Sequence, residues 1–209
     1  MRQNYKFKLN PLPYRYDDME PYIGQKTMKT HHIRHLGAYV SSLNRELARR
    51  PEYNGASLTE IYSSSDEDGS AMRYLSAAVY NHNFFFSLLA PSINDAIRAP
   101  VGCLRAALAR EYGSVERALI KIRDAAIGST VPGWVFLCKN KKGRPEIVFC
   151  NAQSMPDMDI YSPILVLDTW EHAYYLDYLN AKKDYIENNF RLINWNLCEM
   201  FWNSKISYK

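Results

Sequence analysis

A carboxylate and a histidine stand four residues apart near the C-terminal end of the chain, directly after an apolar run. Asp168 follows residues 164–167, four branched apolar residues that are typical of a fully buried strand, although a buried helix has the same pattern. A carboxylate in such a place is costly to bury unless something compensates its charge, and a metal ion is one compensation. Asp168 and His172 could point at one ion, either within one helical turn or across a strand-to-helix bend. The spacing indicates a metal site that needs further ligands.

The other four of the five histidines fall on two predicted helices in the N-terminal half. A single histidine on a helix is more often a satisfied polar residue than a ligand. His31 and His35 are four residues apart and share one helix face, beside His32. His82 stands in the apolar segment 77–86, where a buried imidazole needs a partner. These helices are therefore the places to look for the missing ligands.

The N-terminal half contains two long helical patterns joined by a polar connection. The predicted segments are an extended arm rich in Pro and Tyr (1–26), a long helix capped by Thr27 (27–49), a short capped helix (57–61), a polar loop (63–70) and a second long helix (71–89). The first long helix ends before Pro51 and the second before Pro91, because the residue before a proline disfavours the helical conformation. The pattern predicts a helical hairpin.

The C-terminal half mixes helices with a small sheet. The predicted elements are helices at 101–111, 114–126, 172–180, 183–190 and 192–202, two strands at 134–138 and 146–150 around a basic turn containing Gly143, and a third strand at 164–167. Residues 92–100 form a hinge between two prolines. The sequence therefore predicts an α+β protein with a helical-hairpin domain at 1–92. A second domain at 93–209 holds a three-stranded antiparallel sheet flanked by helices.

The composition excludes several classes of protein. The 209 residues are 47% apolar with a net charge of +4, which is too weak and dispersed to indicate nucleic-acid binding. Apolar runs are short, so we expect no membrane span, and the N-terminus leads into no apolar signal region. Whether a targeting peptide has been removed stays open. The four widely spaced cysteines favour reduced thiols and a cytoplasmic protein.

Residues 168–174 read Asp-Thr-Trp-Glu-His-Ala-Tyr, which resembles the D-x-W-E-H-[STA]-[FY] signature of iron/manganese superoxide dismutases. The resemblance covers nearly the whole chain, because further similar segments stand in the family's order. These segments are Leu12-Pro13-Tyr14 with Met19-Glu20-Pro21, the first long helix from Thr27 to Val40, Asn81-His82-x-x-Phe85, Gly133-Trp134 and Ile193-Asn194-Trp195. Several specific motifs, distant in sequence, therefore indicate one family.

The resemblance implies a metal centre and a reaction. It assigns His31, His82, Asp168 and His172 as ligands of one Mn or Fe ion per subunit, in a five-coordinate site with a position open to solvent or substrate. Three imidazoles and one carboxylate suit either metal. The implied activity is superoxide dismutation, in which M(III) oxidises one superoxide anion to dioxygen. M(II) then reduces a second superoxide to hydrogen peroxide with the uptake of two protons.

The resemblance also assigns residues around the metal. Tyr39, His35 and Gln153 would tune the metal potential through hydrogen bonds, with Gln153 contacting metal-bound solvent. Trp134 and Trp170 would form aromatic walls of the site.

The same signature implies contacts with a second subunit. Glu171 would pair with the partner subunit's His172, and Tyr175 would reach the partner's His35. The expected assembly is a homodimer with an isologous contact, or a tetramer built from it.

The choice of metal follows from where the solvent-contacting glutamine stands. Iron-type members often place it four residues before the second-helix ligand, where this chain has Ala78. Manganese-type members place it before a proline after the hairpin, which resembles Gln153-Ser154-Met155-Pro156. Phe85 is also more manganese-like than tyrosine, whereas Val166 matches neither type. We therefore expect a preference for Mn, or mixed use of Mn and Fe.

Other departures from the family pattern leave the ligands in place but bear on potential tuning and oligomer stability. They are Leu36, Phe86, Pro132, Phe136 and Lys182. Two other functions stay open: a structural protein with a vestigial site, and a zinc hydrolase that uses the same ligands. A hydrolase needs a general base beside the metal, and the one well-placed carboxylate, Glu171, is better explained by the subunit interface.

Overall fold

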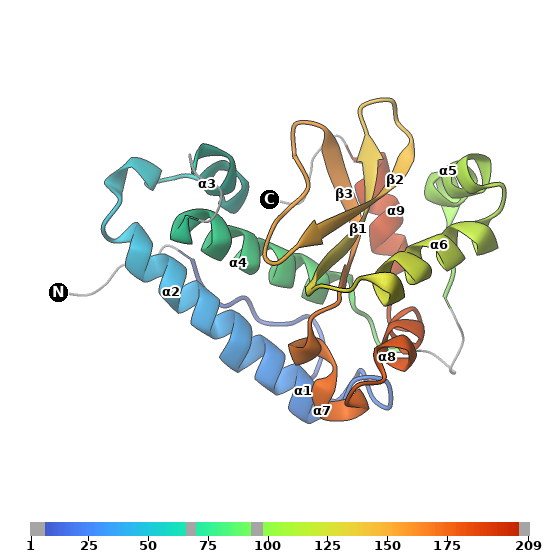
Figure 1. The fold of residues 1–209 in the computed structure, drawn as a ribbon, viewed down its shortest axis with the longest axis horizontal. Coiled ribbons are helices and arrows are strands. Elements are labelled where there is room, and N and C mark those ends of the chain that lie inside the picture. The colour runs from blue at the N-terminus through green and yellow to red at the C-terminus, as the bar shows by residue number, and fades with distance from the viewer. Residues whose placement is uncertain (1–6, 66–69, 93–97, 205–209) are drawn as a thin grey trace.

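Helices form the described N-terminal half of the chain, and the sheet lies in the C-terminal half (Figure 1). The computed structural model describes residues 7–65, 70–92 and 98–204. In chain order its elements are α1 (Gln25–Lys29), the π-helical segment η1 (Thr30–Leu36), α2 (Gly37–Leu47), the 3-10 turn η2 (Pro51–Tyr53), α3 (Leu58–Ser64), α4 (Ala71–Leu88), α5 (Gly102–Tyr112), α6 (Val115–Gly128), β1 (Gly133–Asn140), β2 (Pro145–Asn151), β3 (Tyr161–Asp168), the 3-10 turn η3 (Glu171–Ala173), α7 (Tyr175–Tyr178), α8 (Lys182–Asn189) and α9 (Trp195–Asn203). The α+β class is confirmed.

The first long helix differs from its prediction at its start and in its middle. It begins at Gln25, with Gly24 as the N-cap, while Thr27 lies buried inside α1. The predicted threonine cap is wrong because the helix starts two residues earlier, where other side chains accept: the Gly24 N–H donates to Asp177 Oδ2 at 2.8 Å, and the Gln25 N–H donates to Glu20 Oε1 at 3.1 Å. The helix also widens into η1 between α1 and α2, which the even i, i+4 spacing did not predict.

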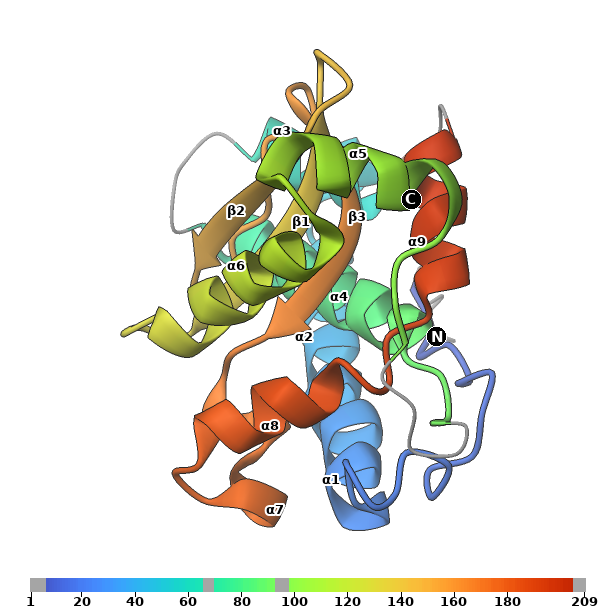
Figure 2. The same ribbon diagram turned by 90° about the vertical axis from the view of Figure 1, so that its right-hand side faces the viewer.

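The hairpin places α4 between α2 and the sheet (Figures 1 and 2). A capping box starts α3, since the Ser57 hydroxyl accepts the Glu60 N–H and the Glu60 carboxylate accepts the Ser57 N–H. Residues 76–82 of α4 are all buried, because neighbours cover the helix on most sides. The tip of the predicted polar loop, 66–69, lies outside the described residues.

The three strands form an antiparallel sheet in the order β2-β1-β3. In this register Trp134, near the start of β1, pairs with Asp168, the last residue of β3. Helix α6 packs against β1 and β2, while α4 and α9 pack against β3 (Figure 2). Strand β3 is therefore covered by helices, which explains why residues 163–168 are buried without alternation.

The segment after β3 corrects another prediction. Instead of one helix at 172–180 there are η3 and the four-residue α7. Tyr174 leaves the helical region with φ −139°, and Leu179 ends α7 with φ 51°, so a continuous helix is interrupted twice.

The two halves are joined by backbone contacts near the end of α4. The Ala90 N–H donates to Leu192 O at 2.7 Å, and the Asn194 N–H donates to Leu88 O at 2.8 Å. The domain boundary between residues 92 and 93 stays a prediction, because 93–97 lie outside the described residues. Within the described ranges, no helix combines the length and the apolar character that crossing a membrane requires.

Candidate metal centre

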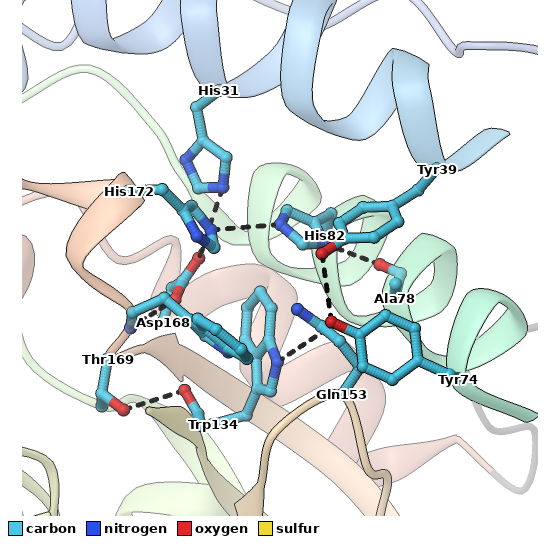
Figure 3. A network of polar contacts seen from close by, with 12 residues as sticks. His31, Tyr39, Tyr74, Ala78, His82, Trp134, Gln153, Asp168, Thr169 and His172 are labelled. Carbon is cyan, nitrogen blue, oxygen red and sulfur yellow. Dashed lines mark hydrogen bonds and ion pairs between the residues drawn. The ribbon is translucent and has the colours of Figure 1, made fainter. Parts of the chain in front are cut away.

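Four side chains from four elements converge at the end of the sheet (Figure 3). His31 comes from η1, His82 from α4, Asp168 from the end of β3 and His172 from η3. One potential ligand atom of each lies within 4.8 Å of the others. The structure therefore brings together the four residues that the sequence resemblance assigned as ligands. Asp168 and His172 meet across a strand-to-helix bend rather than within one helical turn.

The polar atoms of these four side chains lie close together, and two of them lack a hydrogen-bond partner among the described residues. Asp168 Oδ2 lies 3.3 Å from His31 Nε2 and 3.2 Å from His172 Nε2. His82 Nε2 lies 3.3 Å from His172 Nε2. His31 Nε2 and Asp168 Oδ2 are buried and have no hydrogen bond among the described residues. Since buried polar atoms are normally satisfied, these atoms fit a cation at their common centre, and three nitrogens with one carboxylate oxygen suit Mn or Fe.

Burial and neighbouring side chains shift the pKa values of His31, His82 and Asp168 toward the forms that bind a metal ion. It lowers the pKa of His31 to about 4, and burial together with the charge of His31 holds the pKa of His82 well below its usual value. Burial alone would raise the pKa of Asp168, but His172 and His31 outweigh it and lower that pKa. Neutral imidazoles and an ionised carboxylate are the forms that bind metal ions.

Local structure orients each ligand. His82 Nδ1 lies 2.7 Å from Ala78 O, and because a carbonyl oxygen only accepts, Nδ1 donates and Nε2 is left to bind metal. Asp168 Oδ1 accepts the Trp170 N–H at 2.9 Å, which leaves Oδ2 facing the histidines. His31 lies on the π-helical segment η1, a local structure that is frequent at functional sites.

Trp134 and Trp170, the two predicted aromatic walls, each lie beside a histidine of the group. The Trp134 ring meets His82 edge-on with centroids 4.9 Å apart, and the Trp170 ring stacks on His172 at 5.7 Å. Gln153 enters from the connection after β2 and is 2% exposed. Its Oε1 accepts the Trp134 indole N–H at 3.0 Å, whereas its buried Nε2 has no partner among the described residues.

Tyr39 and His35 form another side of the site. The Tyr39 ring lies 4.8 Å from His35 and 5.5 Å from His82, and burial with a hydrogen bond to Tyr74 raises its pKa. Burial lowers the pKa of His35 to about 4. Tyr74 is the residue that sequence reasoning missed. It lies on α4 two helical turns before His82 and belongs to none of the motifs that the sequence shows.

The two residues predicted at a subunit interface lie on the surface, in the ligand turn, which is the turn from Trp170 to Tyr175 that carries His172. Glu171 is exposed, and Tyr175 is 47% exposed, whereas Ala173 and Tyr174 between them are buried. The turn from Trp170 to Tyr175 thus carries one ligand inward and presents other side chains outward.

The departures from the family pattern occupy ordinary packing positions. Phe86 packs edge-on against His31 with centroids 4.9 Å apart. Leu36 is fully buried, and so are Phe136 and Val166, which pair with each other across β1 and β3. Pro132 lies on the surface, where its carbonyl accepts the Ala152 N–H. The Lys182 ammonium donates to the Ser129 carbonyl at 2.9 Å.

Comparison with known proteins shows similarity along almost the whole chain. Residues 6–90 match the alpha-hairpin domain of iron/manganese superoxide dismutases, and residues 100–200 match their C-terminal domain. The chain is 35% identical over 202 residues to the manganese superoxide dismutase of Thermus thermophilus, covering 95% of this chain and 98% of that one. It is 37% identical to the manganese enzyme of Listeria monocytogenes (91% and 94% covered) and 36% identical to the iron enzyme of Escherichia coli K12 (90% and 94% covered).

Proposed function

Because the chain belongs to the iron/manganese superoxide dismutase family, we propose that His31, His82, Asp168 and His172 hold its Mn or Fe ion. The protein is a superoxide dismutase that converts superoxide to dioxygen and hydrogen peroxide. Held by these four residues, a Mn or Fe ion would supply the one-electron redox chemistry that oxidises one superoxide and reduces a second. The observation that carries the assignment is the convergence of four donor atoms within 4.8 Å, from elements far apart in the sequence.

The chain's own residues supply charge, shape and hydrogen bonds. The Asp168 carboxylate offsets part of the positive charge of the ion, while the neutral imidazoles add none. Trp134 and Trp170 cover the ligand histidines and exclude bulk water. Gln153 is the hydrogen-bond donor that we assign to the solvent molecule beside the ion, because its Nε2 is buried without a partner among the described residues.

A preference for Mn, or mixed use of Mn and Fe, is supported by the origin of this amide. Ala78 offers no polar side chain on α4, and its carbonyl is taken by His82. Gln153 instead reaches the site from the connection after β2, the position expected of manganese-type members. The similar proteins include both manganese and iron enzymes at nearly equal identity, so overall identity does not separate the two metals.

The function is tested by metal content and by activity in defined metal forms. We would purify the protein, measure its metals by mass spectrometry, and assay superoxide loss in Mn-, Fe- and Zn-loaded protein. We expect superoxide loss with Mn and a lower rate with Fe. The Zn form should be inactive, because Zn²⁺ has no accessible second oxidation state. If none of these forms is active, the assignment as a superoxide dismutase is overturned. If only the Fe form is active, the preference for Mn is overturned.

A homodimer is proposed on the surface around the ligand turn. Glu171 is exposed there, together with large apolar side chains on and beside α7: Tyr175, Leu176 and Leu179 are 47%, 50% and 63% exposed. Exposed apolar side chains gathered beside a charged residue are typical of a subunit interface. We also place the protein in the cytoplasm, a proposal supported by its four free cysteines.

Substitution Glu171→Ala should weaken this dimer. Glu171 has no ion pair with a described residue, so its loss leaves the single subunit folded while it removes a charge-assisted contact across the interface. Losing such a contact costs about 2 kcal/mol, which raises the dimer dissociation constant about 30-fold. Sedimentation at low protein concentration measures this dissociation constant. Glu187→Ala, an exposed glutamate on α8, is the control, and an equal effect of the two substitutions would refute the interface.

A further inference from the structure

The hydroxyl of Tyr74 on α4 lies 3.4 Å from the hydroxyl of Tyr39 on α2. The two rings meet edge-on, with centroids 6.1 Å apart and an interplanar angle of 62°. Tyr39 in turn lies against the ligand His82, whereas Tyr74 makes no ring contact with any of the four metal-binding residues among the contacts described. In Figure 3 the two hydroxyl groups meet beside the Gln153 side chain. The Tyr39 hydroxyl therefore has a partner that leads away from the metal.

A cavity of about 340 Å³ continues in that direction. It is lined by Tyr62, Arg73, Tyr74 and residues 151–154, so Gln153 borders both the cavity and the metal centre. Tyr74 is 38% exposed, although Gln153 is almost fully buried. The cavity is large enough and polar enough to hold several water molecules. The cavity therefore offers room for water beside Tyr74.

We propose that Tyr74 is a positioning residue for dismutation, whose hydroxyl directs the Tyr39 hydroxyl toward the metal site and connects it to water in this cavity. Reduction of the second superoxide consumes two protons, and the aromatic walls restrict the access of bulk water. A proton can pass from cavity water to Tyr74, from Tyr74 to Tyr39 and from Tyr39 to the reduced product. Each hydroxyl gains one proton as it loses one, so Tyr74 and Tyr39 end the transfer uncharged, and the proton comes from water.

This inference rests on the proposed function and makes a distinct kinetic prediction. Tyr74→Phe keeps the ring and removes the hydrogen bond. A single hydrogen bond of this kind changes a rate about two- to fivefold, so kcat should fall by that factor. The value of kcat/KM should stay within about twofold, because substrate access is unchanged. Azide, a small anionic probe, should bind the oxidised Mn form about two- to fivefold more weakly by visible absorbance, because the Tyr39 hydroxyl loses one of the two polar side chains beside it, Tyr74, and keeps Gln153.

The experiment includes two matched comparisons. Tyr112→Phe removes another tyrosine hydroxyl with a 3.4 Å contact, to Pro145 O far from the site, and should change neither kcat nor azide binding. In a Tyr39→Phe background, Tyr74→Phe should have no further effect, because the two hydroxyls act as one unit. Full additivity of the two substitutions, or an active Tyr74→Phe enzyme with unchanged kcat and azide affinity, would overturn the role of Tyr74. A wild-type protein without activity in the Mn and Fe forms would overturn the proposed function, and this inference with it.

Discussion

Substitution His82→Ala is expected to abolish metal binding and superoxide loss together. His82 is fully buried, and its Nε2 faces the other donors while Nδ1 is held by the Ala78 carbonyl. Without this imidazole three donors remain, so bound metal should fall to background by mass spectrometry. A metal present at a thousand times its dissociation constant stabilises the folded state by about 4 kcal/mol, so loading should raise the melting temperature of the wild type by roughly 10 °C. The variant should lose this rise.

The neighbouring histidine provides the control for His82→Ala. His32 is buried as well, but its ring nitrogens lie 2.9 Å from the Tyr16 hydroxyl and 2.9 Å from Asn10 O, away from the metal centre. His32→Ala should lower the melting temperature of the metal-free protein and still show the rise on Mn loading. Normal metal content in His82→Ala, or loss of metal in both variants, would contradict the ligand assignment.

The second large effect is expected for Gln153→Ala, which should retain metal but lose most activity. Gln153 touches none of the ligand atoms in the described contacts, so metal content should match the wild type. Removing a residue that hydrogen-bonds beside a metal typically costs about 10- to 100-fold in activity. Superoxide loss at saturating substrate should therefore fall by about that factor, because solvent beside the ion loses its hydrogen-bond donor.

Two further variants sharpen the reading of Gln153→Ala. Trp134→Phe keeps the wall of the site but removes the indole N–H that holds Gln153 Oε1 at 3.0 Å. It should lower activity in the same direction by a smaller factor, because the amide stays in place with less constraint. Gln25→Ala, at an exposed position in α1, should have no effect. An unchanged rate in Gln153→Ala would mean that another group contacts the solvent.

Local chemistry made much of this protein predictable from its sequence. The buried apolar run before Asp168, the four-residue step to His172 and the isolated apolar setting of His82 are short-range patterns, and each was sufficient to mark a candidate ligand. The hairpin of β1 and β2 followed from two β-rich runs around a glycine turn. The capped α3 followed from Ser57 and Glu60, and the end of α4 followed from the proline beyond it. These features depend on residues within a few positions of one another, which is why periodicity and capping rules suffice.

Tertiary structure decided the features that depend on distant partners. The Gly24 N–H at the start of α1 is bound by the distant Asp177, and the η1 widening that carries His31 leaves no mark in a regular pattern. The contact between Tyr39 and Tyr74 arises because α2 and α4 pack side by side, at a separation of 35 residues. Residue types and spacing therefore marked candidate side chains, and the family resemblance chose His31 among the histidines of the first helix. Only the packing of η1, α4, β3 and η3 decided where their atoms meet, since contact energies between distant segments are not encoded in any one local window.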